Sequence, residues 1–222
     1  MRIVQPVVLV ALPAIMMLWA WLRLPNGALV TSVCACVALV PFFVGFERSR
    51  RRARDLMPIV VLTALAVAGR LVFAPVPAIK PIIALVVMGG LCFGREDGFM
   101  IGALAMLVSN VFFGQGPWTP WQMFSMGLVG YLAGVMGSQG WLSRRWSIAA
   151  FGAAMALLYG FILDTWSIVG FVTNANAASV LATYAAGLAN NVASAIGTVA
   201  FLVPIARSWP RMFGRIKERY LT

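Results

Sequence analysis

The side chains best suited to recognise a small molecule lie together in the stretch FFGQGPWTPWQMF, residues 112–124. Flat aromatic rings, and amides that both donate and accept hydrogen bonds, suit the non-covalent binding of a flat polar ligand. Prolines that fix φ and glycines that permit close backbone approach favour a rigid loop. The pattern predicts a lid over a ligand, and the alternative is an anchor at a membrane–water interface. The candidate ligand-binding residues of this stretch are Gln115, Trp118, Thr119, Trp121 and Gln122.

Arg70, Lys80 and Asp164 are charged residues that lie away from the basic segments of the chain. Arg70 lies within an apolar run, about one helical turn from its end, and burying such a charge in a bilayer costs at least ~2.5–3.5 kcal/mol. Its side chain either extends to the interface or faces a polar cavity, where it pairs with Asp164 or with an anionic group of a ligand. Lys80, in the connection that follows, is a second candidate for that anionic group.

The last apolar run carries a row of small and polar residues on one helix face. A spacing of four residues defines this row, which consists of Ala182, Ala186, Asn190, Ser194 and Thr198. The row either packs closely against another helix or forms one wall of a pocket, with Asn191 beside it. Asn174 and Asn176, in the connection before this run, offer further amides.

The chain lacks the groups that enzyme catalysis and metal binding require. It contains no histidine, and five of its six acidic residues lie beside arginines in the basic segments. No paired carboxylate, activated nucleophile or metal-ligand cluster is evident. The three cysteines lie inside apolar runs and are expected to be reduced and buried. We therefore expect a protein without catalytic residues, bound metal or cofactor.

The elements that position these residues are transmembrane helices. The composition is 62% hydrophobic and 10% charged, and the mean hydropathy is +0.92. Since a bilayer-spanning helix needs about 20 mostly apolar residues, the sequence predicts an all-α integral membrane protein with eight spans. The predicted spans are residues 4–22, 28–46, 57–74, 81–94, 98–114, 122–138, 147–164 and 179–206.

The distribution of positive charge predicts the orientation in the membrane. Fourteen of the 17 Lys and Arg residues lie at alternate ends of the predicted spans, and only Arg23, Arg70 and Lys80 lie toward the other side. The positive-inside bias then places both termini in the cytoplasm, and the net charge of +11 needs no nucleic-acid partner. The connections 75–81, 114–121 and 165–179 are predicted to face outward, so the candidate site is on the outer side.

Three motifs in the middle of the chain resemble a known family. They are KP at 80–81, GFxxGAxxxLVSNxFFGQGPWTPWQM at 98–123 and GxLAG at 130–134. Together they resemble the substrate-binding S component of energy-coupling factor (ECF) vitamin transporters, over roughly residues 57–206. The resemblance implies a six-helix membrane bundle that binds a vitamin from outside beneath its first, third and fifth loops. These loops correspond to the three outward connections.

This resemblance also implies a domain organisation. Residues 1–46 form two additional N-terminal transmembrane helices, to which no task is assigned. Residues 47–56 form a basic cytoplasmic loop, 57–206 the S-component-like domain, and 207–222 a basic cytoplasmic tail. The expected location is the cell membrane of a prokaryote, in contact with the lipid bilayer.

The family resemblance implies partners and a ligand class. S components dock on a membrane-embedded T subunit through small residues of their first core helix, and Ala64 and Ala68 have the spacing that close helix approach requires. The chain has no GxxxxGK[ST] phosphate-binding loop, so two separate ATPase subunits are expected to supply energy. Within the family, the GQGPWTPWQ loop and the KP pair most resemble cobalamin-type members.

Two other functional classes remain open at this stage. A small secondary transporter would need an intramembrane ion site to couple its fluxes, and Asp164, at a predicted span end, is the one candidate. A membrane scaffold with an outer protein-binding face would share the same polar outer loops. A ligand-binding assay separates the scaffold from the vitamin binder.

Overall fold

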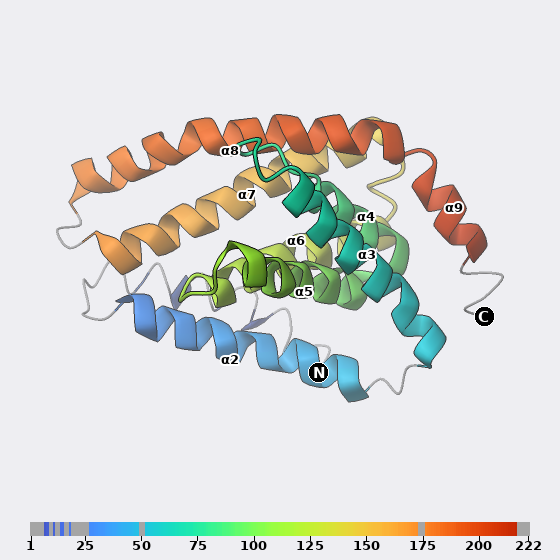
Figure 1. Cartoon of the computed structure of the whole chain (residues 1–222), viewed down its shortest axis with the longest axis horizontal. Coiled ribbons are helices and arrows are strands. Elements are labelled where there is room, and N and C mark those ends of the chain that lie inside the picture. Colours follow the sequence, from blue (N-terminus) through green and yellow to red (C-terminus); the bar gives the residue numbers. More distant parts are fainter. Residues whose placement is uncertain are drawn as a thin grey trace.

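The computed structural model describes residues 27–48, 52–172 and 176–216, together with isolated positions between residues 7 and 18. In the three continuous ranges all regular secondary structure is helical (Figure 1). The helices are α2 (Gly27–Arg48), α3 (Ala53–Val72), α4 (Ile82–Phe93), α5 (Arg95–Phe113), α6 (Thr119–Ser138), α7 (Arg145–Phe171), α8 (Ala177–Ile205) and α9 (Trp209–Ile216).

The helices confirm the prediction of an all-α membrane protein. Each predicted span from residue 28 onward contains one helix, while the predicted first span, 4–22, lies largely outside the described residues. Five helices are long and apolar enough to cross a membrane, namely α2, α3, α5, α7 and α8. The helix α4 has only 12 residues. The count of eight spans and the cytoplasmic placement of both termini stay predictions.

The centre of the molecule is formed by α4, α5 and α6, which pack closely through glycines. A Cβ added at Gly130 of α6 would collide with the carbonyl group of Gly98 in α5. A Cβ added at Gly90 of α4 would in turn collide with the carbonyl oxygen of Gly130. Small residues let helix backbones approach closely in a membrane, so these glycines determine how near the three helices lie.

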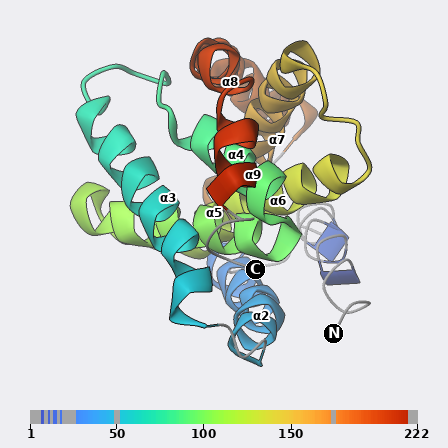
Figure 2. The same ribbon diagram turned by 90° about the vertical axis from the view of Figure 1, so that its right-hand side faces the viewer.

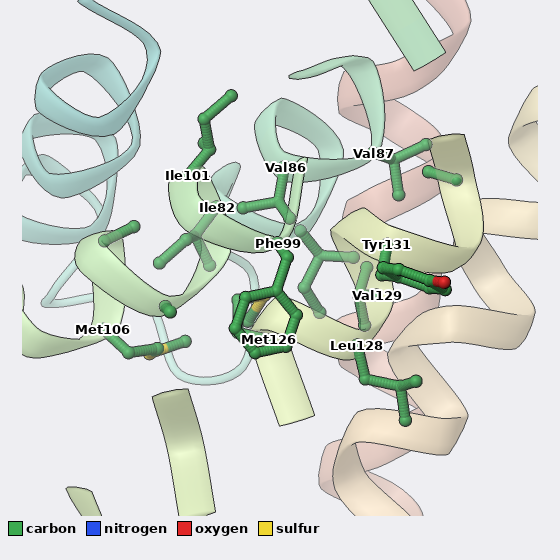
Figure 3. Packing of buried hydrophobic residues seen from close by; sticks show 14 of the residues in the cluster. Ile82, Val86, Val87, Phe99, Ile101, Met106, Met126, Leu128, Val129 and Tyr131 are labelled. Atoms are coloured by element: carbon green, nitrogen blue, oxygen red, sulfur yellow. The ribbon is translucent and has the colours of Figure 1, made fainter. Parts of the chain in front are cut away.

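Large apolar side chains fill the space around this glycine contact. Phe99 of α5 is fully buried and lies beside Met126 of α6, while Val86 of α4 closes the other side (Figure 3). The helix α6 is buried along most of its length, from Thr119 to Gly134. The central three helices thus form a closely packed platform, and the 114–118 loop lies at one end of it.

Of the remaining helices, α2, α3, α7 and α8 pack around this centre. The helices α7 and α8 pack along each other on one side, and α2 lies on the other (Figures 1 and 2). Phe42 of α2 stacks on Phe99 with 3.7 Å between ring centroids. The helix α2 also contacts α6 and α7, so it is an integral part of the packed structure.

Two features of the fold differ from the sequence-based expectation. The helix α7 continues to Phe171, so much of the predicted outward connection 165–179 is helical and Asp164 lies inside a helix rather than at its end. Trp166 is buried, and the Thr165 hydroxyl lies 2.9 Å from the hydroxyl of Tyr184 in α8. Packing against α8 therefore extends the helix. The predicted tail 207–222 begins with the short helix α9.

Candidate functional site

Arg70 is the charged centre of a polar cluster at one end of the bundle. It lies in the last turn of α3, and its Nη1 atom donates hydrogen bonds to the Ser109 hydroxyl and to Asn110 Oδ1, the latter at 2.8 Å. Both acceptors belong to the last turns of α5 and are almost fully buried. The guanidinium therefore points into the protein, so the predicted inward-facing alternative is supported over simple extension to the interface.

Asn110 connects this arginine to the start of α6. Its amide nitrogen donates to Gln122 Oε1 at 2.7 Å and to the Thr119 hydroxyl at 3.2 Å. Because its carbonyl oxygen accepts from Arg70, both ends of the Asn110 amide have partners. An amide bonded at both ends has a fixed orientation, so Asn110 joins α3, α5 and α6 in one polar network.

The 114–118 loop closes over the same network. The Thr119 hydroxyl donates to Gln115 Oε1 at 2.9 Å, and Gln115 Nε2 donates to the carbonyl oxygen of Leu107 at 2.9 Å. Gly114 has a φ of 99°, which side-chain-bearing residues rarely adopt, and this glycine ends α5. The loop is thus bonded to the helices on both sides of it, as a rigid lid requires.

Two cations meet at one aromatic ring beside the network. The Arg70 guanidinium carbon lies 4.6 Å from the centroid of the Phe113 ring, and Lys80 Nζ lies 5.5 Å from the same centroid. Burial, and then the positive charge of Arg70, lower the pKa of Lys80 below its ordinary value. Neither cation forms an ion pair in the described part of the chain. The cluster is therefore positively charged and rich in hydrogen-bond donors.

The two tryptophans of the predicted lid differ in position. Trp118 is 36% exposed and packs against Gly116. Trp121 is fully buried and meets Phe124 edge-on, and its indole N–H has no hydrogen-bond partner in the structure. This differs from the sequence-based expectation of two open aromatic faces, because Trp121 lies within helix α6 and points into the core. Only Trp118 offers a face to a ligand.

Asp164 belongs to a second polar pair, between α7 and α8. Its carboxylate accepts a hydrogen bond from Asn191 Nδ2 at 2.8 Å, and no ion pair joins it to Arg70 within the described residues. Glycines at 160 and 187 make room for the two side chains, since a Cβ at either position would collide with them. Arg70 and Asp164 are therefore not a pair. Arg70 binds Ser109 and Asn110, whereas Asp164 binds Asn191.

The remaining candidates lie on α8, in the connection before it and on α3. Asn191 is buried, whereas Asn190 is exposed, so the inward face of α8 is rotated from the predicted row. The Asn176 side chain accepts from the backbone N–H of Ser179 at 2.8 Å and caps the start of α8. Asn174 lies outside the described residues. Ala64 and Ala68 are exposed on α3.

The comparisons with known proteins assign the chain to a family. Residues 52–207 match the model of the family described as ECF-type riboflavin transporter, S component. The chain belongs to this family. No curated protein and no solved structure gives a significant match. As an S component it is a membrane-embedded, substrate-binding subunit of an ECF transporter for vitamins, and ATPase activity lies in partner subunits. S components work together with T and ATPase subunits.

The family match begins after the helix α2. The S-component region starts at residue 52, so α2 precedes it in the chain. The helix nonetheless contacts the region at its functional end, because the Ser32 hydroxyl donates to the carbonyl oxygen of Pro117 at 2.7 Å. A helix outside the family region therefore holds the loop of this S component that closes over the polar network.

Four residues of the cluster were missed by sequence reasoning. Ser109, Asn110 and Phe113 bond or pack directly with Arg70, and the Tyr159 hydroxyl of α7 contacts the Met106 sulfur, one turn before Asn110 in α5. A signal for the first two exists, since a Ser–Asn pair in the apolar run AMLVSNVFF is expensive to bury unless it has polar partners. Tyr159 carried no comparable signal, because tyrosine is common in apolar helices.

Proposed function

We propose that this S component captures a flat, polar heteroaromatic vitamin of the flavin class beneath the 114–118 loop. It then delivers the vitamin inward together with a T subunit and two ATPase subunits, in the plasma membrane of a prokaryote. The observation that carries this proposal is the chain of contacts from Arg70 through Asn110 to Gln122, which fixes polar groups of three helices directly under the loop. The family description, which names riboflavin, supports the ligand class.

The hydrogen-bonding capacity of the cluster favours a ligand rich in acceptors. Asn110 is used at both ends, while Gln122 Nε2, Lys80 Nζ and the other N–H groups of Arg70 have no partner in the described part of the chain. The ring system of a flavin carries two carbonyl oxygens and ring nitrogens along one edge. Donors held in fixed positions would bond this edge, and the open ring of Trp118 would cover a flat face.

Cobalamin, the ligand type suggested by the sequence motifs, is the competing candidate. A corrinoid is much larger than a flavin and would need broad aromatic contact. Because Trp121 is buried in the core, Trp118 alone provides an open indole in this loop. The smaller aromatic surface supports a ligand of flavin size, so we place the corrinoid second.

A binding titration with matched variants tests the proposal. Purified protein in detergent is titrated with riboflavin, cobalamin and thiamine, and with Asn110→Leu and Asn190→Leu variants in parallel. We expect riboflavin to bind most tightly. Asn110→Leu should weaken binding roughly thirtyfold, because Arg70 and Gln122 lose the amide that orients them. The exposed Asn190→Leu should bind like wild type. Cobalamin binding without riboflavin binding would refute the flavin class and leave the family assignment intact.

The T-subunit contact is proposed on the outer face of α3. Ala64 and Ala68 lie on this face next to the exposed side chains of Val60, Val61 and Leu65. Small residues at i and i+4 allow another helix to approach closely, while the surrounding aliphatic side chains provide packing area. Both alanines point away from the polar cluster, so docking through them leaves the binding site accessible from the outer side.

A further inference from the structure

A cavity of about 700 Å³ lies at the end of the bundle opposite the polar cluster. Its walls come from the end of α4, the turn before α7, and the junction of α8 with α9. It does not coincide with the proposed vitamin site, which lies where α3 and α5 end and α6 begins. The ends of the helices are joined here by basic segments, so this is the predicted cytoplasmic side.

The rim of this cavity is positively charged. Arg144 and Arg145 approach it from the start of α7, and Arg207 approaches it from the end of α8. None of the three forms an ion pair in the described part of the chain, and no acidic side chain lines the cavity. The N-terminus of the 27-residue helix α7 adds a further partial positive charge at the same place. Unneutralised cations from two separate segments favour an anionic ligand.

The interior of the same cavity is apolar. Leu142, Ile148 and Ala206 line it, and each is almost fully buried. A soluble anion would gain little from these surfaces, whereas a ligand with a charged head and a hydrocarbon tail would contact both parts. The chemistry of the lining therefore matches an amphipathic anion better than a free one.

The surroundings place the cavity at a membrane–water interface. Trp141 and Trp146, on either side of the turn before α7, are 64% and 61% exposed. Exposed tryptophans are typical of the headgroup level of a bilayer. The short helix α9 packs across the end of the bundle, where the ring of Phe213 meets that of Phe93 with 5.1 Å between centroids. Figure 2 shows α9 lying across the end of α4.

We propose that this cavity binds an anionic phospholipid, with its phosphate on Arg144, Arg145 and Arg207 and an acyl chain along Leu142 and Ile148. The lipid would join the start of α7 to the end of α8 and so fix the inner end of the bundle. This proposal does not depend on the identity of the vitamin.

Lipid retention in two charge-matched variants tests the proposal. The cavity variant carries Arg144→Gln, Arg145→Gln and Arg207→Gln. The control variant carries Arg48→Gln, Arg52→Gln and Arg54→Gln at the α2–α3 junction, where the arginines are also exposed but line no part of the cavity. Full-length proteins are delipidated in neutral detergent, and binding of phosphatidylglycerol and phosphatidylcholine is measured by native mass spectrometry, with melting curves to confirm folding.

We expect wild type and the control variant to prefer phosphatidylglycerol, and the cavity variant to lose this preference by roughly tenfold or more. Equal loss in both variants would show a general effect of surface charge, and retention in both would place the lipid elsewhere; each result overturns the proposal. Inorganic phosphate should not displace the lipid, and full displacement at millimolar concentration would indicate a simple anion site instead. Should the triple variant melt early, single Arg207→Gln gives the same comparison against Arg54→Gln.

Discussion

The Ser32 hydroxyl donates a hydrogen bond to the carbonyl oxygen of Pro117 at 2.7 Å. This contact joins α2, which precedes the S-component region, to the loop that closes over Arg70 and Asn110. Toward the C-terminal end of α2, the stacking of Phe42 on Phe99 also fixes the helix against α5. The additional helix, which also contacts α6 and α7, thus supports the loop, and nothing in the sequence pattern indicated this role.

Replacing Ser32 with alanine should loosen the 114–118 loop. A neutral hydrogen bond contributes about 0.5–1.5 kcal/mol net, so local opening should become roughly two- to twelvefold more frequent. Hydrogen–deuterium exchange of peptides covering 112–124 measures this opening. Cys36→Ala, which removes an exposed atom of similar size one turn along the same helix, should leave exchange unchanged. Identical exchange in Ser32→Ala and wild type would show that the contact does not hold the loop.

Replacing Trp118 and replacing Trp121 should affect different properties of the protein, namely ligand affinity and stability. Trp118→Ala should weaken vitamin binding about thirtyfold with little change in melting temperature, because its ring is partly exposed. Trp121→Ala should instead lower the free energy of unfolding by about 3–5 kcal/mol, because it removes a fully buried side chain. Titration and thermal melting of both variants separate these effects, and exposed Trp146→Ala is the control. A stable Trp121→Ala protein with impaired binding would contradict the core assignment.

Lys80 should make the binding of a phosphorylated ligand depend on pH. Burial and Arg70 lower the pKa of Lys80, and a bound phosphate would raise it again by stabilising the charged form. Binding of riboflavin 5′-phosphate should therefore take up protons, and should weaken as pH rises through the lowered pKa of the free protein. Riboflavin itself should show a smaller effect. Calorimetry in buffers of different ionisation enthalpy measures the uptake.

Lys80→Arg is the control for this titration, since arginine stays protonated throughout the accessible range. The variant should bind the phosphorylated ligand with an affinity that no longer changes over the same pH interval. If wild type and Lys80→Arg show the same pH profile, Lys80 does not contact the phosphate.

Bulky substitutions on the outer face of α3 should block assembly and spare vitamin binding. Ala64→Trp and Ala68→Trp would prevent close approach of a T-subunit helix, and both positions lie away from the polar cluster. Co-purification with the T and ATPase subunits, together with titration of the isolated protein, measures the two properties. Leu188→Trp, on the exposed face of α8, is the matched control. Equal loss of assembly and of binding would indicate misfolding rather than a lost interface.

Cysteine labelling in intact cells tests the predicted orientation. In a variant with Cys34, Cys36 and Cys92 replaced by alanine, a cysteine at Gln115 should react with an impermeant reagent. A cysteine at Arg50 should react only after the cells are opened, because the positive-inside bias places it in the cytoplasm. The reverse pattern would invert the topology and move the proposed vitamin site to the inner side.

The sequence by itself determined the class of the protein and the place of its polar loop. Long apolar runs can satisfy their backbone groups in a bilayer only as helices, so the helical spans follow from composition alone. The unusual density of Gly, Pro, Trp and Gln at 112–124 likewise identified the loop that lies over Arg70 and Asn110. Both properties are local, and neither requires knowledge of which helices are neighbours.

Only the tertiary structure decided which side chains face inward. In a membrane both the lipid-facing and the core-facing sides of a helix are apolar, so periodicity carries little information about the rotation of each helix. One residue along a helix turns the side chain by about 100°, which is why Asn191 rather than Asn190 meets Asp164. The partner of Arg70 was decided in the same way. The glycine contact between α5 and α6 brings Asn110 next to Gln122, and Arg70 donates to Ser109 and Asn110 rather than to a distant acid.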